Sequence, residues 1–127
     1  MDIVIIGDGK VGHKLAMQLS GESYNVTLID QCEKKLADTV NEMDVSCVVG
    51  DGASAEIQKK ADVPGADLVI ACTSTDEMNM FCCLLARRLG AKQTIARVRN
   101  PVYSEQIHLL KEDLKLSMAV NPELALA

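Results

Sequence analysis

Aromatic side chains and basic charge are both scarce in this sequence. The 127 residues include no Trp, one Phe and two Tyr, and the formal net charge at pH 7 is −5. Nucleic-acid-binding domains need a basic surface against the phosphate backbone, and many stack bases on aromatic rings. The composition therefore argues against a nucleic-acid-binding protein.

Long apolar runs are also missing. No run reaches the roughly 18–20 residues that cross a bilayer, so direct membrane insertion is not expected. Met1 and Asp2 precede the apolar residues 3–6 without a basic segment, which argues against a signal peptide. The length fits one globular domain of about 100–200 residues.

The cysteines show no pairing pattern. Their number is odd, no C-x-x-C motif occurs, and no histidine lies at the spacing of a metal ligand. The sequence therefore predicts neither a zinc site nor a disulfide framework, and we expect reduced thiols buried in the core. The five residues are Cys32, Cys47, Cys72, Cys82 and Cys83.

What the sequence does contain is a regular alternation of strand and helix patterns. Residues 3–6 are a continuous β-branched run, typical of a strand buried on both faces, and residues 10–20 follow with helical spacing. We expect further strands over 25–29, 45–49, 67–71, 94–98 and 116–120, and helices over 31–42, 54–61, 76–89 and 101–110.

This alternation predicts one α/β domain over residues 1–121. Successive strand–helix–strand units give a parallel sheet with right-handed crossovers and helices on both faces. Six strands in this rhythm match the doubly wound Rossmann fold, with the strand order 3-2-1-4-5-6.

Residues 7–12 form a glycine motif, Gly7-Asp8-Gly9-Lys10-Val11-Gly12, between the first strand and the first helix. In that context G-x-G-x-x-G indicates dinucleotide binding. The first glycine permits the tight turn, the second lets a diphosphate approach the backbone, and the third lets the helix pack on the strand. The N-terminus of the helix then faces the phosphates. A glycine turn with no ligand is the alternative.

Asp30 supplies the second part of the pattern. It lies 18 residues after Gly12, at the end of the second strand. A carboxylate there accepts hydrogen bonds from ribose hydroxyls and repels the 2′-phosphate of NADP. A Walker A loop is excluded because His13 and Lys14 follow Gly12. The expected ligand contains adenosine diphosphate with an unphosphorylated ribose, as NAD(H), ATP and ADP do.

Further candidates follow the ends of later strands, where ligands of this fold bind. Asp76 has a second interpretation as a helix N-cap, and Arg97 as a surface ion pair. His13 and His108 have no carboxylate or nucleophile at an interpretable spacing, so we expect exposed helical histidines. The candidate binding residues are Gly7, Asp8, Gly9, Lys10, Val11, Gly12, Asp30, Gln31, Asp51, Gly52, Thr73, Ser74, Asp76 and Arg97.

In combination these segments resemble a known family, the N-terminal nucleotide-binding domains of TrkA-type proteins, also called RCK or KTN domains. These proteins are cytoplasmic regulators of prokaryotic potassium uptake. The resemblance covers nearly the whole chain, in order, through residues 5–12, 28–30, 49–52, 73–79 and 96–103.

The resemblance implies a regulatory domain rather than an enzyme. Such domains bind NAD(H) or ATP/ADP, form homodimers and rings, and act on a potassium transporter or channel at the inner face of the membrane. Their chains usually continue into a C-terminal lobe, so residues 122–127 would begin a linker helix. The carried-over roles are diphosphate binding by Gly7, Gly9 and Gly12, ribose binding by Asp30, adenine-side contact by Asp51, contact with the far half by Thr73 and phosphate binding by Arg97.

An NAD-dependent oxidoreductase, or the cofactor-binding half of one, is the alternative function. Hydride transfer needs a positioned acid or base beside the nicotinamide, and no pattern in the sequence places one.

The helices expected over 76–89 and 101–110 have more apolar residues than one buried stripe needs, which predicts a contact surface. The family resemblance implies that a homodimer uses this surface. Coverage by the core and by a C-terminal segment is the alternative. The residues concerned are Met78, Met80, Phe81, Leu85, Ile107 and Leu109.

Overall fold

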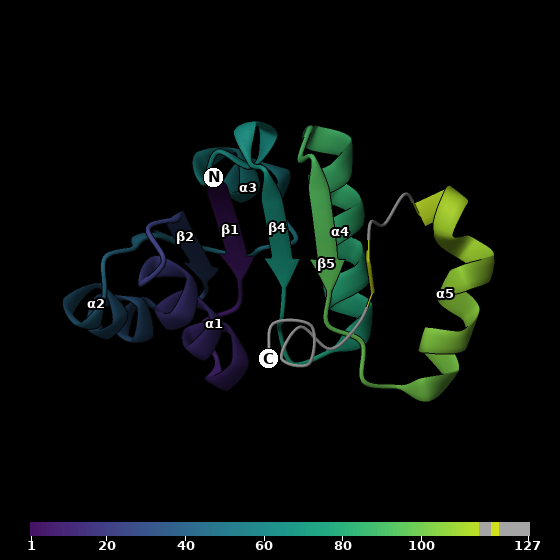
Figure 1. Cartoon of the computed structure of the whole chain (residues 1–127), viewed down its shortest axis with the longest axis horizontal. Helices are drawn as coiled ribbons and strands as arrows, with labels where there is room; N and C mark the ends of the chain where they lie inside the picture. Colours follow the sequence, from purple (N-terminus) through teal and green to yellow (C-terminus); the bar gives the residue numbers. More distant parts are fainter. Residues whose placement is uncertain (115–117, 120–127) are drawn as a thin grey trace.

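A six-stranded parallel sheet forms the centre of the protein (Figure 1). The structure is a computed structural model that describes residues 1–114 and 118–119. The predicted boundary at 121 and the linker helix over 122–127 lie outside these residues. The strands are β1 (Asp2–Ile6), β2 (Asn25–Asp30), β3 (Ser46–Val49), β4 (Leu68–Ala71), β5 (Gln93–Ala96) and β6 (Met118–Ala119).

The strand order is β3-β2-β1-β4-β5-β6, and each neighbouring pair is parallel. This confirms the predicted doubly wound topology. The chain moves outward from β1 in one direction through β2 and β3, and in the other through β4, β5 and β6. The carboxyl ends of β1 and β4 therefore meet at the switch point where this fold binds ligands.

Helices cover both faces of the sheet. They are α1 (Lys10–Ser20), α2 (Glu33–Glu42), α3 (Ala55–Lys60), α4 (Asp76–Leu89) and α5 (Pro101–Leu114), with a 3₁₀ turn at Val63–Gly65. Alternate residues of β1 point to opposite faces. Ile3 and Ile5 pack with α1 and α2, whereas Val4 and Ile6 belong to the cluster that contains α4.

The start of α2 differs from its prediction for a clear reason. The helix expected to begin at residue 31 begins at Glu33. The Asp30 carboxylate accepts a hydrogen bond from the Cys32 backbone N–H at 2.8 Å, and this two-residue turn keeps Gln31 outside the helix. The last helix runs four residues beyond its prediction, to Leu114.

The cysteine prediction is confirmed in part. Cys72, Cys82 and Cys83 are buried and Cys47 is half-buried, all as free thiols. Cys32 is exposed, which corrects the expectation that it lies in the core. It occupies the N-cap position of α2, whose buried side begins further along at Leu36.

The third glycine of the motif brings α1 onto β1. A Cβ at Gly12 would overlap the carbonyl oxygen of Gly7. A Cβ at Gly9 would meet no heavy atom within 4 Å. The packing of the protein itself therefore requires glycine at position 12 but not at position 9, although both match the same motif.

We expect Gly12→Ala to lower the free energy of unfolding by about 1–3 kcal/mol, because the added methyl group forces α1 away from the turn. Gly9→Ala is the matched control, with an expected change within about 1 kcal/mol, the usual cost of replacing a helix N-cap. Urea unfolding followed by circular dichroism measures both. An unchanged midpoint in Gly12→Ala would contradict the close packing.

Candidate functional site

A cleft of about 440 Å³ lies at the carboxyl ends of β1, β2, β3 and β4. We call it the strand-end cleft. Eight predicted site residues meet there, although they come from four separate segments of the chain. They are Gly7, Gly9, Asp30, Gln31, Asp51, Gly52, Thr73 and Ser74.

The carboxylate of Asp30 is held at the rim of this cleft by two backbone groups. Its Oδ2 accepts from the Asp8 N–H at 2.7 Å, and its Oδ1 accepts from the Cys32 N–H at 2.8 Å. Each carboxylate oxygen has two lone pairs. Asp30 is therefore fixed in place and still has acceptor capacity for a hydroxyl-bearing ligand.

The glycine turn leaves the N-terminus of α1 open. Gly7 adopts φ +110°, and a Cβ there would approach the Cys72 carbonyl oxygen to 2.9 Å, so this position requires glycine. Gly9 is the N-cap of α1; no side chain caps it, and the first turn has no acidic residue. Uncapped N–H groups and the positive end of the helix dipole attract an anion.

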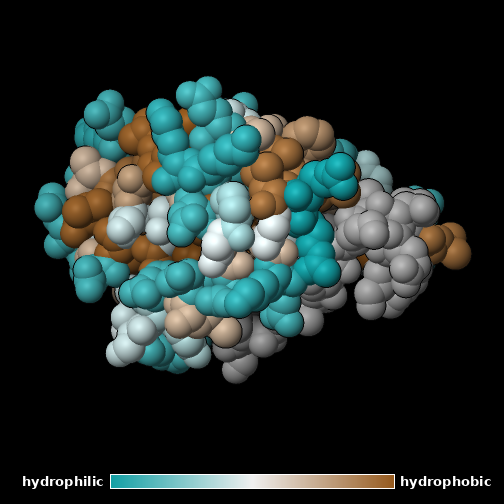
Figure 2. All heavy atoms as spheres, turned by 90° about the horizontal axis from the view of Figure 1, so that it is seen from above, coloured by the Kyte–Doolittle hydropathy of each residue, from teal (hydrophilic) through white to brown (hydrophobic). Residues whose placement is uncertain are grey.

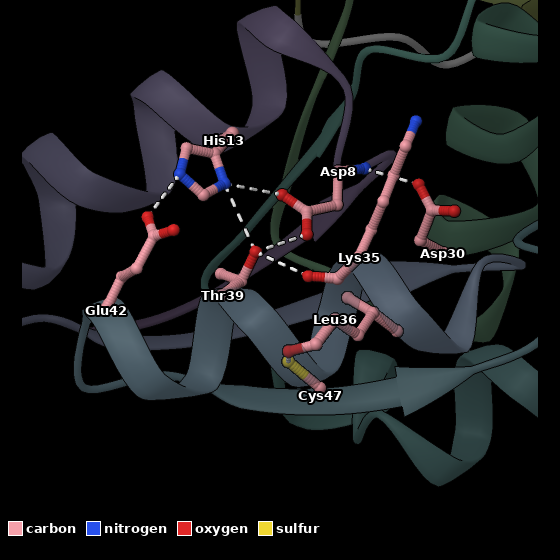
Figure 3. A network of polar contacts seen from close by, with 8 residues as sticks. All are labelled: Asp8, His13, Asp30, Lys35, Leu36, Thr39, Glu42 and Cys47. Atoms are coloured by element: carbon pink, nitrogen blue, oxygen red, sulfur yellow. Dashed lines mark hydrogen bonds and ion pairs between the residues drawn. The ribbon is translucent and has the colours of Figure 1, made fainter.

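Asp8 lies in the same turn, but its side chain points away from the cleft. The Asp8 carboxylate is buried and accepts from Thr39 Oγ1 at 2.6 Å, on the side of the turn that faces α2 (Figure 3). The contribution of Asp8 to the cleft is therefore its backbone N–H, which holds Asp30.

The expectation of an exposed histidine at position 13 is corrected, because the His13 side chain is only 30% exposed and contacts two carboxylates. His13 Nδ1 lies 3.1 Å from Asp8 Oδ1, and Nε2 lies 3.0 Å from Glu42 Oε2 (Figure 3). Glu42 is 29 residues away in the sequence, so spacing gave no sign of this contact. The side chain of His108 lies outside the described part of the structure.

A second cavity of about 520 Å³ adjoins the strand-end cleft and shares Gly9, Thr73 and Ser74 with it. We call it the basic basin, because four cationic residues line it. The Arg99 guanidinium donates to the Ser74 carbonyl oxygen at 2.8 Å, which keeps the group at the rim. The basic basin also contains three more of the predicted residues, Lys10, Val11 and Arg97, together with Lys14.

Asp76 was predicted to bind the ligand or to cap the following helix, and the structure shows a third role. The N-cap of α4 is Thr75, whose Oγ1 accepts from the Met78 N–H at 3.3 Å. The buried Asp76 carboxylate instead accepts the backbone N–H groups of Arg99 at 3.0 Å and Asn100 at 2.8 Å. Asp76 thus holds the loop after β5, and it lines neither the cleft nor the basin.

Asn79 is a residue that the sequence reasoning missed. It is buried on α4, and its Oδ1 accepts from both the backbone N–H and the hydroxyl of Thr73, each at 2.7 Å. Its Nδ2 donates to the Arg97 carbonyl oxygen at 2.8 Å. A signal existed, because Asn79 shares a helix face with the buried Cys82, Cys83 and Ala86, and a buried amide requires partners.

Gln58 holds the Gly52 side of the cleft, as Asn79 holds Thr73. Its buried side-chain Nε2 donates to the Gly52 carbonyl oxygen at 2.8 Å and to the Cys82 carbonyl oxygen at 3.1 Å. The loop after β3 is thereby tied to α4. No periodicity in the short α3 indicated this contact.

Two buried cysteines line the two cavities, Cys82 in the strand-end cleft and Cys72 in the basic basin. Burial raises the pKa of Cys82, which lines the cleft, to about 12. Burial also raises the pKa of Cys72 to about 12, although the charge of Arg97 opposes this shift. Both thiols are therefore protonated near neutral pH, and the thiolate is the reactive form.

The described residues contain neither a metal-ligand cluster nor a membrane-spanning helix. They contain no group of three or more His, Cys, Asp or Glu side chains that could hold a metal ion. No helix among them is long and apolar enough to span a membrane.

The comparisons with known proteins agree on one family. The family model of the TrkA-N domain matches residues 3–122. A Trk system potassium uptake protein TrkA homolog from Archaeoglobus fulgidus is 35% identical over 127 residues, which cover the whole of this chain and 29% of that protein. The chain thus spans about a third of the length of this relative.

Solved structures share the fold. The TrkA-N domain of the inner membrane protein ybaL from Escherichia coli superposes with a TM-score of 0.83 at 19% identity, covering 98% of this chain and 90% of that one. The GsuK channel bound to NAD superposes with a TM-score of 0.78 at 22% identity, covering 94% and 21% of the two chains. A GsuK structure bound to ADP has the same TM-score and identity, with coverage of 94% and 31%.

We expect Asn79→Ala to lower the free energy of unfolding by about 1–3 kcal/mol, because it leaves the Thr73 N–H and the Arg97 carbonyl group without this partner. Asn41→Ala, at an exposed position of α2, is the matched control and should change stability by less than about 0.5 kcal/mol. Urea unfolding of both variants tests this, and equal stabilities would contradict the role given to Asn79.

Proposed function

Because the chain belongs to the TrkA-N domain family, we propose that it is the nucleotide-binding regulatory domain of a potassium uptake transporter or channel. The observation that carries this proposal is the anchored Asp30 carboxylate beside an uncapped helix N-terminus. The carboxylate suits a ribose, and the uncapped helix N-terminus suits a diphosphate.

The residues present fit an adenine nucleotide. Asp30 would accept hydrogen bonds from the ribose, and Gln31, Asp51 and Gly52 would lie on the adenine side. Gly9 lines both cavities, and an added Cβ there would meet no protein atom within 4 Å, so a diphosphate has room to approach the backbone.

The far half of the ligand would enter the basic basin. Thr73 and Ser74 belong to both cavities, and Arg97 lies beyond them. The proposal includes NAD(H), ATP and ADP, because all contain adenosine diphosphate with an unphosphorylated ribose. The NAD and ADP in the GsuK structures support this choice of ligand class.

A regulatory role follows from the kind of groups in the cleft. The described residues that line the cleft and the basic basin supply hydrogen bonds and positive charge, and the buried thiols of Cys82 and Cys72 are protonated near neutral pH. The name of the Archaeoglobus fulgidus relative supports potassium uptake as the process regulated. We therefore place the domain in the cytoplasm, where a membrane-embedded potassium transporter or channel subunit is its partner.

The outer faces of α4 and α5 are the proposed homodimer surface. Phe81 is 52% exposed, Val102 is 54% exposed and Leu109 is 82% exposed. Ile107 is buried and Met80 packs against the core, so these two predicted contact residues serve the fold instead.

Figure 2 looks onto the amino-terminal end of the strands, opposite the cleft, where hydrophilic side chains lie between smaller apolar areas.

Binding of the nucleotide would affect the potassium transporter or channel through the homodimer surface on α4 and α5. Asn79 and Asp76 of α4 hold the segments that bear Thr73, Arg97 and Arg99. A ligand that binds two arrangements of these segments unequally shifts the population of α4 positions by that difference in affinity.

We expect Asp30→Ala to weaken NAD binding by about 5- to 150-fold, which corresponds to about 1–3 kcal/mol for a lost hydrogen bond to a charged acceptor. NADP should bind the unmodified chain much more weakly than NAD, because its 2′-phosphate meets the carboxylate. Isothermal titration calorimetry measures both affinities. Asp44→Ala, which removes the same charge at an exposed position outside the cleft, is the control. Equal affinities for NAD and NADP would exclude Asp30 from the ribose site.

We expect the chain to dimerise and Phe81→Asp to shift it toward the monomer, because a carboxylate in an apolar interface loses its hydration. Light scattering at several protein concentrations measures the mass. Val40→Asp on α2, which is 47% exposed in the unmodified chain, is the control and should leave the mass unchanged. A strict monomer at high concentration would refute the proposed surface.

A further inference from the structure

A charged cluster lies between α1 and α2, on the side of the glycine turn away from the strand-end cleft (Figure 3). We call it the His13 cluster; its members are Asp8, His13, Thr39 and Glu42. The Asp8 side chain is 1% exposed, that of His13 30% and that of Glu42 51%. The cluster thus extends from the protein interior to the surface.

The two carboxylate contacts of the His13 ring, beside a third contact of 3.2 Å from Nδ1 to Thr39 Oγ1, require two protons. A neutral imidazole has one N–H donor and one acceptor nitrogen, whereas a carboxylate only accepts. His13 has Asp8 Oδ1 at 3.1 Å from Nδ1 and Glu42 Oε2 at 3.0 Å from Nε2. Both hydrogen bonds exist together only when the ring is the imidazolium cation.

The buried Asp8 carboxylate depends on this ring. Its other side-chain donor is Thr39 Oγ1 at 2.6 Å, and that hydroxyl also lies 2.9 Å from the Lys35 carbonyl oxygen. One hydroxyl proton therefore serves two acceptors. A buried carboxylate with too few donors is costly, so His13 supplies a contact that Asp8 needs.

Asp8 connects the His13 cluster to the strand-end cleft. Its backbone N–H donates to Asp30 Oδ2 at 2.7 Å, and its neighbours are Gly7 and Gly9. Glu42 and Thr39 belong to α2, which begins three residues after Asp30. The cluster therefore joins the glycine turn, α1 and α2, the three segments around the proposed ribose and diphosphate sites.

We infer that His13 is a positioning residue for the nucleotide site. In its protonated form it holds the glycine turn and α2 together and so presents Asp30 to the ribose. This inference rests on the proposed function. Loss of the proton breaks one of the two contacts and removes a positive charge near the open end of α1. Both effects weaken nucleotide binding, so affinity falls as the pH rises across the range in which histidine side chains ordinarily lose their charge.

The other ionisable groups around His13 come from every element packed against it. Among these side-chain types, histidine is the one whose charge ordinarily changes between about pH 5 and 8. Burial and the charge of Asp8 raise the pKa of the Cys47 thiol, which therefore stays neutral in that range. The surrounding groups are Asp8, Asp30, Lys10, Lys14, Lys35, Asp38, Glu42 and Cys47.

NAD is the probe of choice for the test. Terminal phosphates of ADP and ATP titrate near pH 6, whereas the diphosphate of NAD has no such group. Calorimetric titration of the 127-residue chain between about pH 5.5 and 8.5 should show affinity falling by about 5-fold or more as the pH rises, a typical size for coupling between sites. Near the midpoint, binding should take up protons, measured as a dependence of the heat on the buffer.

Three variants separate His13 from other sources of pH dependence. His13→Gln should give a flat affinity profile and no proton uptake. Glu42→Gln replaces one of the two carboxylates that accept from the ring and should reduce the pH dependence of the affinity; Glu42 is exposed, so folding should be unaffected. His108→Gln replaces the other histidine of the chain, on α5, and should keep the profile of the unmodified protein.

Each result decides something different. A flat profile in the unmodified chain, or a pH dependence that persists in His13→Gln, overturns the role of His13 and leaves the proposed function standing. If His13→Gln does not fold, the affinity profile of Glu42→Gln decides in its place, and a profile identical to that of the unmodified chain overturns the inference. Absence of binding of NAD, ADP and ATP at every pH would refute the proposed function, and this inference with it.

Discussion

The close approach of α1 to the end of β1 is the constraint on which the rest of the structure depends. A side chain at Gly12 would overlap the Gly7 carbonyl oxygen, and one at Gly7 would press on the Cys72 carbonyl group. With neither present, the N-terminus of α1 lies at the switch point between β1 and β4, beside Asp30. The cleft, the basin and the buried position of Asp8 all follow from that placement.

The fold was readily predicted because its signals are local. Continuous β-branched runs, helical spacing and glycine punctuation each lie within one segment, and the handedness of crossovers converts their order into the sheet. The boundary at residues 31–32 was missed for a reason that periodicity does not express. There a side chain, that of Asp30, turns the backbone before α2 begins.

The site was predicted less completely, and its gaps have a common physical cause. Residues that follow strand ends converge because parallel strands end at one edge, so Asp30, Asp51 and Thr73 were found from position in the chain. Asn79, Gln58 and the contact of His13 with Glu42 depend on which face of a helix meets which loop. The direction of the Asp8 side chain depends on α2, 31 residues further along. These contacts exist only once the layers have packed.

Backbone groups hold most of the cleft, and this determines how it can respond to a ligand. Asp30 is fixed by the N–H groups of Asp8 and Cys32, and Thr73 is fixed by Asn79. The two ends of the cleft are thus held by different elements. Asp30 is bonded to the glycine turn and to the turn before α2, whereas Thr73 is bonded to Asn79 of α4. A nucleotide of the proposed class that spans both ends would join these two sets of contacts, and a ligand that reaches only Asp30 would not. The length of the ligand, as well as its charge, is therefore a criterion for the proposed site.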